Sequence, residues 1–256
     1  MIKNTLIMKV SIITATFNSE KTILDTLKSL EQQTYKNIEY IVIDGASSDK
    51  TVELIQNNST RVTKIICEPD QGIYDALNKG IYASTGDVIG FLHSDDLFAS
   101  NIAVENIVNK FKSDGCDAVY GDLKYVAQDN ISKVIRVWKS GEYNLSSIKS
   151  GWMPPHPTFF MKRELYEKFG GFDLGFKIAA DYDSLLRYLW TNQISLAYLP
   201  EVLTLMRMGG ASNRNLKNIL QKTKEDINIL SKNKVPVFRA ILMKNISKIP
   251  QFIFLK

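Results

Sequence analysis

Short apolar runs alternate with segments of helical periodicity over the first hundred residues, and this alternation constrains the fold more than any other feature. The apolar runs occupy residues 10–15, 38–44, 62–68 and 87–96. Helical segments begin near Ser19, near Ser48 and at 72, and Ser47 or Ser48 can cap the second of them. Strands joined in turn by helices form a parallel sheet that helices cover on both faces. We therefore predict an α/β fold whose first half, about residues 1–98, binds a nucleotide.

The second half, about residues 99–212, has a different pattern. Residues 118–127 and 131–138 read as paired strands around a Gln-Asp-Asn turn. A stretch with two adjacent prolines and little periodicity follows at 141–160 and predicts a long mobile loop. The sequence then predicts a helix over 176–190 and a strand over 194–200.

A basic segment, residues 213–256, follows the predicted domain of residues 1–212. From Arg214 onward it carries a net charge of +8, which leaves −3 for the rest of a chain whose total is +5. This distribution argues against a nucleic-acid-binding core and favours a tail that meets an anionic partner. Helical periodicity from Asn215, and again after Pro236, predicts amphipathic helices. The first has apolar positions at Leu216, Ile219, Leu220, Thr223, Ile227 and Leu230.

The ends and the cysteines of the chain bear on its compartment. Lys9 interrupts the first apolar run, and no stretch approaches the roughly 20 apolar residues that span a bilayer. Cys67 and Cys116 lie in apolar runs, so we expect buried, reduced thiols. We therefore expect a cytoplasmic protein, or one on the cytoplasmic face of a membrane.

Acidic residues follow several of the predicted strands. Asp44 closes the second, Asp95 and Asp96 follow the fourth, and Asp122 follows the fifth. The carboxyl ends of parallel strands meet at one edge of a sheet, where ligands bind. Paired carboxylates suit Mg²⁺ or Mn²⁺, which often share their ligands with substrate phosphates. The alternative is that Asp95 or Asp96 caps a helix that begins near Ala99.

Three stretches, residues 10–51, 68–96 and 170–189, together resemble family 2 glycosyltransferases, and ordered similarity extends over about residues 8–212. The resemblance implies the GT-A fold, which is a Rossmann-like, mostly parallel sheet flanked by helices. It also implies a nucleotide-sugar donor, inversion at the anomeric carbon and a divalent metal, Mn²⁺ or Mg²⁺. Bacterial enzymes that build surface or capsular polysaccharide are the most similar subgroup, and their acceptors are glycans or lipid-linked sugars.

The resemblance carries roles onto individual residues. Asp44 matches the aspartate that contacts the base, usually uracil, and Asp95 matches a residue near the ribose. Asp96 matches the metal ligand, and Asp181 matches the catalytic base. Other expected donor-binding residues are Thr14, Ala15 and Asn18 in the first loop, Asn78 and Lys79 on a helix, and the glycines at 209–210 near the diphosphate.

Two departures from the family pattern stand out. Many relatives have Asp-Asp-Gly where this chain has Asp44-Gly45-Ala46, so one acidic contact to the nucleotide is missing. Many also have Glu-Asp at the base, where Ala180 precedes Asp181 here. The base remains, but its acidic neighbour does not.

Each assignment has a plainer alternative. Asp181 could belong to an ordinary surface ion-pair network with Asp183 and Arg187, which are spaced (i, i+4). Lys79 could be a solvated surface cation. His156 and Trp152 could line the acceptor site, or serve as loop anchors.

His93 lies just before Asp95 and Asp96, which we call the acid pair, and is expected to pack at the strand end. The basic tail could lie on an anionic membrane, or be a solvated helix face. The function that accounts for most of these features is sugar transfer from a nucleotide-sugar, UDP being favoured by family habit.

The alternatives are a catalytically inactive nucleotide-sugar-binding module and another nucleotide-sugar enzyme such as a nucleotidyltransferase. The first would be expected to lose Asp96 or Asp181, and the second to carry a Gly- and Arg-rich first loop. Neither a G-x-G-x-x-G dinucleotide motif nor a P-loop occurs.

Overall fold

The computed structural model describes residues 7–209 and 216–246. The strands are β1 (Val10–Thr16), β2 (Ile38–Asp44), β3 (Val62–Cys67), β4 (Val88–Phe91), β5 (Leu97–Phe98), β6 (Ala118–Val126), β7 (Val134–Trp138), β8 (Phe160–Lys162) and β9 (Leu196–Arg207). The helices are α1 (Ile23–Glu31), α2 (Thr51–Asn58), α3 (Ile73–Ala83), α4 (Ala103–Asp114), α5 (Leu145–Ile148), α6 (Arg163–Phe169), α7 (Ala180–Leu186), α8 (Leu216–Lys232) and α9 (Val237–Ile246).

Within the described ranges the strands form one sheet in the order β3-β2-β1-β4-β8-β6-β9-β5, and β7 also pairs with β6. The first four strands are parallel, as predicted. The second half is mixed, because β8 inserts antiparallel between β4 and β6 while β6 and β9 run parallel. The predicted hairpin of 118–138 is confirmed as β6 and β7.

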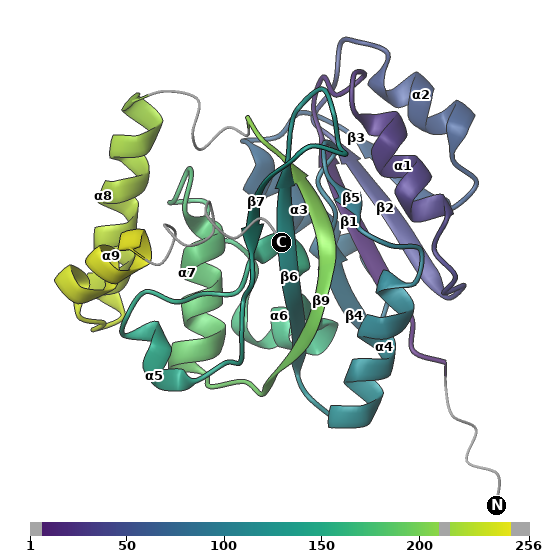
Figure 1. Cartoon of the computed structure of the whole chain (residues 1–256). Helices are drawn as coiled ribbons and strands as arrows, with labels where there is room; N and C mark the ends of the chain where they lie inside the picture. Colours follow the sequence, from purple (N-terminus) through teal and green to yellow (C-terminus); the bar gives the residue numbers. More distant parts are fainter. Residues whose placement is uncertain (1–6, 210–215, 247–256) are drawn as a thin grey trace, which may run out of the picture.

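Alternate residues of the central strands enter two separate cores, as the period of two in a strand requires. Ile12 and Val42 pack with α1, α2 and α4, whereas Ile13 and Ile41 pack with α3 and α7 on the opposite face. Helices therefore cover both faces of the sheet (Figure 1). The carboxyl ends of β1, β2 and β4 are left to form the site.

Helix starts differ from the predictions. Helix α1 begins at Ile23, because Ser19 to Thr22 form a turn in which the carbonyl of Ser19 accepts the N–H groups of Thr22 and Ile23. Helix α2 begins at Thr51, so the predicted caps Ser47 and Ser48 are wrong. The Asp49 carboxylate accepts the Thr51 N–H instead, at 3.0 Å.

The fourth apolar run, residues 87–96, forms a shorter strand than predicted. Strand β4 ends at Phe91, Asp95 and Asp96 lie in the connection, and β5 pairs with β9. Helix α4 starts only at Ala103, so neither aspartate caps it. This removes the capping alternative for the acid pair.

The predicted long mobile loop, residues 141–160, is instead built into the structure. It contains α5 and a 3₁₀ turn at His156–Thr158, and it leads into β8 in the middle of the sheet. Met153, Pro154 and Pro155 are buried. The sequence of this segment shows little helical or strand periodicity, because tertiary contacts hold most of it in place and it contains only short regular elements.

Three further predictions need correction. The helix of 176–190 begins at Ala180 and continues past Leu186 as a π-helical turn, Arg187–Thr191. The last strand is longer than 194–200 and runs to Arg207. Cys116 is buried as expected, but Cys67 is exposed, because β3 lies at the edge of the sheet. Both thiols are free.

Helices α8 and α9 confirm the predicted amphipathic helices and lie beside α7, away from α1 and α2 (Figure 1). The predicted inner face of α8 is largely wrong, since Ile219, Leu220 and Ile227 are exposed. Glu225 and Asp226 are buried instead. No helix of the described ranges is long and apolar enough to cross a bilayer.

Candidate active site

Asp44 ends β2 and is fully buried. Its carboxylate accepts the N–H and the hydroxyl of Ser47, at 2.8 and 2.6 Å, and the Cys67 thiol at 3.2 Å. These contacts fix the orientation of the carboxylate at the edge where the first two loops meet. A Cβ at the next residue, Gly45, would lie 2.5 Å from Asp70 Oδ2, so a side chain there would displace the Asp70 carboxylate. Asp70 thus puts an acidic group beside the position where many relatives have a second aspartate.

The loops after β1 and β2 are joined by Asn18. Its side-chain oxygen accepts the Ser48 N–H at 2.9 Å, and its own N–H donates to the Ser47 hydroxyl. Asn18 has φ of 49°, in the left-handed region that asparagine tolerates. The two serines that the sequence suggested as helix caps therefore close this pair of loops.

Thr14 and Ala15 lie at the end of β1 and are buried. The Thr14 hydroxyl donates to the Leu92 carbonyl at 2.6 Å and accepts from the Tyr40 hydroxyl at 3.0 Å. Its hydrogen bonds are therefore internal, and they join β1 to the chain that leads to the acid pair.

Asn78 and Lys79 make protein contacts on α3. The Asn78 amide exchanges two hydrogen bonds of 2.8 Å with the backbone of Phe172. The Lys79 ammonium lies 2.9 Å from Glu68 and 3.4 Å from Asp75. Asn78 thus holds the segment that leads to Asp181, and Lys79 belongs to a half-buried ion-pair cluster rather than being simply solvated.

The acid pair is held by a residue that the sequence did not single out. Arg207, at the end of β9, donates from its backbone to Asp96 Oδ1 at 3.2 Å and from its guanidinium to the Asp95 carbonyl at 3.0 Å. It also pairs with Asp25 on α1. A charged residue inside the apolar run LTLMRM was the available signal.

Asp96 is only 1% exposed. Its Oδ2 atom has no hydrogen-bond partner among residues 7–209 and 216–246. Burial raises the pKa of this carboxyl well above its ordinary value, and the Asp95 carboxylate acts in the same direction. A buried, unpartnered carboxylate oxygen is costly unless a cation meets it.

His93 and His156 lie next to the acid pair, with ring centroids 6.0 Å apart. Burial lowers the pKa of both, that of His156 to about 4, so His156 is neutral at pH 7. His156 packs against Phe91 and Phe172, and neither ring nitrogen is hydrogen-bonded within the described ranges. It is therefore not a loop histidine tied to backbone.

Asp181 lies in the first turn of α7. Its Oδ1 accepts the Tyr182 N–H at 2.9 Å and the Tyr74 hydroxyl at 3.2 Å. Burial raises the pKa of Tyr74 well above its ordinary value and the Asp181 carboxylate adds to this, so the phenol stays protonated and donates.

Acids of the two halves act on the same side chains. Asp95 and Asp181 both raise the pKa of His93 against the effect of burial, and Asp96 and Asp181 both raise that of Tyr125. Ring contacts run from His93 to His156, from His156 to Phe172 and from Phe172 to Tyr74, whose hydroxyl contacts Asp181 Oδ1. Side chains in contact therefore link the β4–β5 connection to the start of α7.

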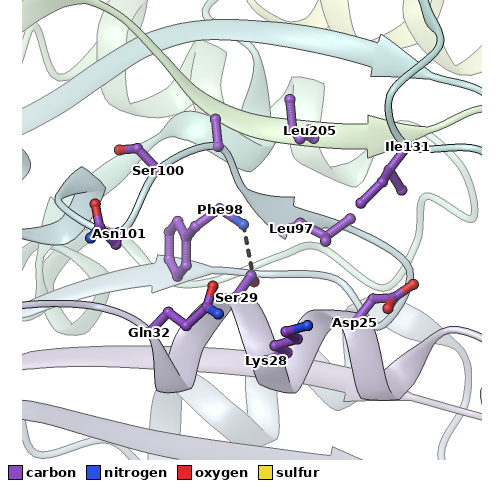
Figure 2. A pocket seen from close by; sticks show the side chains of 11 residues that line it. Asp25, Lys28, Ser29, Gln32, Leu97, Phe98, Ser100, Asn101, Ile131 and Leu205 are labelled. Atoms are coloured by element: carbon purple, nitrogen blue, oxygen red, sulfur yellow. Dashed lines mark hydrogen bonds between the residues drawn. The ribbon is translucent and has the colours of Figure 1, made fainter.

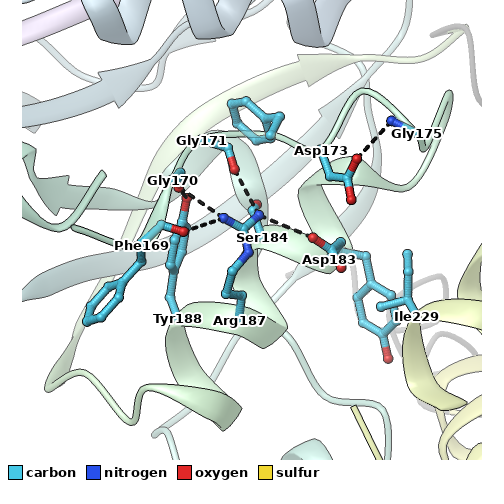
Figure 3. Close-up of polar contacts among 12 residues, drawn as sticks. Phe169, Gly170, Gly171, Asp173, Gly175, Asp183, Ser184, Arg187, Tyr188 and Ile229 are labelled. Carbon is cyan, nitrogen blue, oxygen red and sulfur yellow. Dashed lines mark hydrogen bonds and ion pairs between the residues drawn. The ribbon is translucent and has the colours of Figure 1, made fainter. Parts of the chain in front are cut away.

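The segment before Asp181 is held by Arg187 (Figure 3). Its guanidinium donates to the carbonyls of Phe169, Gly170 and Gly171 at 2.6, 3.1 and 2.8 Å. It also pairs with Asp183, at 3.2 Å, and the Asp183 side chain is only 5% exposed. The expected (i, i+4) pair exists, but it is a buried support of the loop, and Asp181 is not part of it.

Trp152 is half-buried beside Tyr120 and Tyr143, with ring centroids 5.6 Å away in each case. Its indole N–H donates to the Ser140 carbonyl at 3.0 Å. These contacts make Trp152 an anchor of the segment between β7 and β8.

A cavity of about 670 Å³ lies behind the acid pair, between α1 and β5 (Figure 2). Asp25, which pairs with Arg207, forms part of its wall. The Ser29 hydroxyl accepts the Phe98 N–H there, at 3.2 Å. Asp44, Asp96 and Asp181 do not line this cavity.

The chain is similar to known proteins both in sequence and in fold. Residues 11–177 match the model of the family described as Glycosyl transferase family 2. An uncharacterized glycosyltransferase of Mycobacterium tuberculosis (strain CDC 1551 / Oshkosh) is 36% identical over 180 residues, which are 70% of this chain and 68% of the relative.

Two solved structures share the fold. Residues 1–349 of S. aureus TarS, in complex with UDP-GlcNAc, give a TM-score of 0.68 at 19% identity over 87% of this chain and 67% of that one. The mannosyltransferase PcManGT from Pyrobaculum calidifontis, in complex with GDP-Man and Mn²⁺, gives 0.64 at 18% identity over 94% and 70%. This chain spans 39% of a longer TarS chain. The likenesses confirm the predicted GT-A fold.

Proposed function

This chain belongs to glycosyl transferase family 2 and is a glycosyltransferase, and from that premise we propose that it moves a sugar from a UDP-sugar to a hydroxyl group of a glycan or lipid-linked acceptor in polysaccharide biosynthesis, with inversion. The observation that carries the proposal is the run of side-chain contacts from His93, beside Asp95 and Asp96, through His156, Phe172 and Tyr74 to Asp181. Inverting transfer needs a site for the leaving diphosphate and a base on the opposite side of the sugar.

The residues present fit a divalent cation at Asp96. Its Oδ2 is a buried carboxylate oxygen without a partner in the described part of the chain, and hard cations prefer such donors. No group of three or more His, Cys, Asp or Glu side chains in that part is arranged to hold a metal ion by itself. Asp96, with Asp95 beside it, would hold Mn²⁺ or Mg²⁺ together with the donor diphosphate. A bound metal would stabilise the charge that develops on the leaving diphosphate.

Asp181 takes the proton of the attacking hydroxyl. Its hydrogen bonds within the described ranges both go to Oδ1, from Tyr74 and from the Tyr182 N–H, so Oδ2 remains for the acceptor. A carboxylate fixed on one oxygen presents the other in a defined direction. His156, neutral and unpartnered within those ranges, and Trp152 are proposed to border the acceptor.

The donor base and ribose are proposed to lie against the loops after β1 and β2. Ala15, at the end of β1, and Asn18, in the loop after it, are proposed to contact the base and ribose. Asp44, at the end of β2, is proposed to contact the base, and Asp95 to lie near the ribose. Thr14 and Asn78 support this surface through their internal hydrogen bonds. Lys79 lies on the neighbouring helix, α3, and its cationic charge favours the diphosphate.

Donor binding gives the direct test. We expect one class of nucleotide-sugar to raise the melting temperature by about 5 to 10 °C at 100 times its Kd, and to do so more with Mn²⁺ than without it. The measurement is a thermal-shift screen of UDP-, GDP- and dTDP-sugars, each with Mn²⁺ or with EDTA. The selected donor then enters a transfer assay, in which UDP release is followed with octyl glycosides as acceptors. A chain that no nucleotide-sugar stabilises would contradict the proposal.

Helices α8 and α9 are proposed to rest on an anionic membrane surface at the cytoplasmic face. Leu220 and Phe238 are 64% and 82% exposed, and they lie among lysines and arginines of the basic segment. Such a surface gains apolar burial and about 1 kcal/mol for each basic residue near anionic lipid.

Flotation with phosphatidylglycerol vesicles tests this contact. The double variant Leu220→Ser and Phe238→Ser should lose most of the bound fraction, because it removes exposed apolar side chains without changing charge. Tyr82→Ser is the matched control, since Tyr82 is 95% exposed on α3. Equal flotation of the two variants would argue against membrane contact through α8 and α9.

A further inference from the structure

Glu225 on α8 lies under the start of α7. The residue is only 6% exposed, and its carboxylate accepts three successive backbone N–H groups. Oε1 accepts that of Lys177 at 3.0 Å, and Oε2 accepts those of Ile178 and Ala179 at 2.9 Å each. Gln221, one turn earlier, donates its amide to Oε1 at 2.8 Å.

These N–H groups lie at and just before the start of α7. The first N–H groups of a helix have no carbonyl partners within the helix and need acceptors from elsewhere. A carboxylate at this end is also favoured by the helix dipole. Burial by itself raises the pKa of Glu225, but the hydrogen bonds from Gln221 and from the three N–H groups outweigh it and hold the pKa below its ordinary value. The group is therefore ionised at neutral pH.

The same segment is bound from its other side by Tyr74. The Tyr74 hydroxyl lies 2.7 Å from the Ile178 carbonyl and 3.2 Å from Asp181 Oδ1. Ile178 is thus bound through its N–H by α8 and through its carbonyl by α3. Three residues later the chain presents Asp181, so these two contacts define where that carboxylate lies.

We infer that Glu225 on α8 positions the segment 177–181 and hence Asp181. The inference rests on the proposed role of Asp181 as the base. It extends the functional unit beyond residue 177, where the match to the family model ends. Glu225 is a positioning residue, because it contacts backbone and not substrate.

Glu225 is not needed merely to dock α8. Asp226 pairs with Lys244 at 2.9 Å, and the Asn233 carbonyl accepts the Trp190 indole N–H at 3.1 Å. Ile229 and Leu230 are fully buried in the same core as α7. The helix therefore keeps several contacts when Glu225 is changed.

Glu225→Gln tests the inference. The amide keeps the volume of the side chain but sets an NH₂ group against backbone donors, so the segment 177–179 loses a fixed position. We expect kcat in the transfer assay to fall about 10- to 100-fold, as a misplaced catalytic group requires, with the donor KM within about twofold. Hydrogen–deuterium exchange of the peptide that spans 176–182 should accelerate.

Asp226→Asn is the matched control, because it removes the neighbouring buried carboxylate on the same helix, which pairs with Lys244 on α9 and not with the backbone of 177–179. It should leave kcat and exchange at 176–182 unchanged. The inference is overturned if Glu225→Gln keeps the wild-type kcat, if exchange at 176–182 does not change, or if Asp226→Asn lowers kcat equally.

The two proposals fail separately. The proposed function is contradicted if the wild-type chain binds no nucleotide-sugar or transfers no sugar. The inference about Glu225 is contradicted if the wild type is active and the Glu225→Gln variant is equally active. Exchange at 176–182 reports on the Glu225 contact even without turnover.

Discussion

Asp181→Asn is expected to reduce sugar transfer by about 10²- to 10⁴-fold while donor binding stays nearly unchanged. Asparagine has the shape of aspartate, and its oxygen can still accept the Tyr74 hydroxyl and the Tyr182 N–H that Asp181 Oδ1 accepts now. Its amide group cannot take a proton from the acceptor hydroxyl. The loss should therefore fall on kcat, because the missing interaction exists only in the transition state.

Two measurements check this result. UDP release with an octyl glycoside gives kcat, and the thermal shift with the selected donor and Mn²⁺ gives binding. Asp173→Asn serves as the control, since Asp173 is an exposed carboxylate in the preceding loop whose Oδ1 accepts the Gly175 N–H. Normal turnover by Asp181→Asn would discard the assignment of the base.

Asp96→Asn is expected to abolish the Mn²⁺-dependent part of donor binding and to lower transfer by at least about 10²-fold. The substitution removes the buried carboxylate oxygen that has no protein partner in the described ranges. It also removes a buried carboxyl whose ionised form burial disfavours, so the metal-free variant should melt at the same temperature as the wild type or higher. A general collapse of the loop would lower that temperature instead.

The control for this prediction is Asp122→Asn. Asp122 is also a buried acid of a strand in the sheet, but its Oδ1 accepts the Ser140 N–H and the Tyr198 hydroxyl, both at 2.8 Å. We expect this variant to be less stable while its donor binding keeps the response to Mn²⁺. If Asp96→Asn bound the donor with the same dependence on Mn²⁺ as the wild type, a metal at Asp96 would be refuted.

Much of the site could be predicted because its signals are local. Asp44 follows a run that can only be a buried strand, and the acid pair stands between two such runs. Asp181 opens a helix in a motif that resembles the family. In each case the position at a strand end or a helix start follows from residues that are near in the sequence.

The supports of the site could not be predicted in this way. Arg207 holds the Asp95 carbonyl across 112 residues, and Glu225 holds Lys177 across 48. Periodicity in the sequence does not predict hydrogen bonds between residues so far apart. On α8, the apolar pattern assigned Ile219, Leu220 and Ile227 to the buried face, yet two acids are buried there instead.

Sequence patterns predict the alternation of strands and helices, the family and the acids at the strand ends, because period and motif depend on residues near one another. Tertiary structure alone decided which charges are buried. A buried carboxylate is tolerated only where donors meet it, and the donors of Glu225 belong to a distant backbone segment. The burial of such a carboxylate is set when the helices and strands pack together, and no local pattern of side chains predicts it.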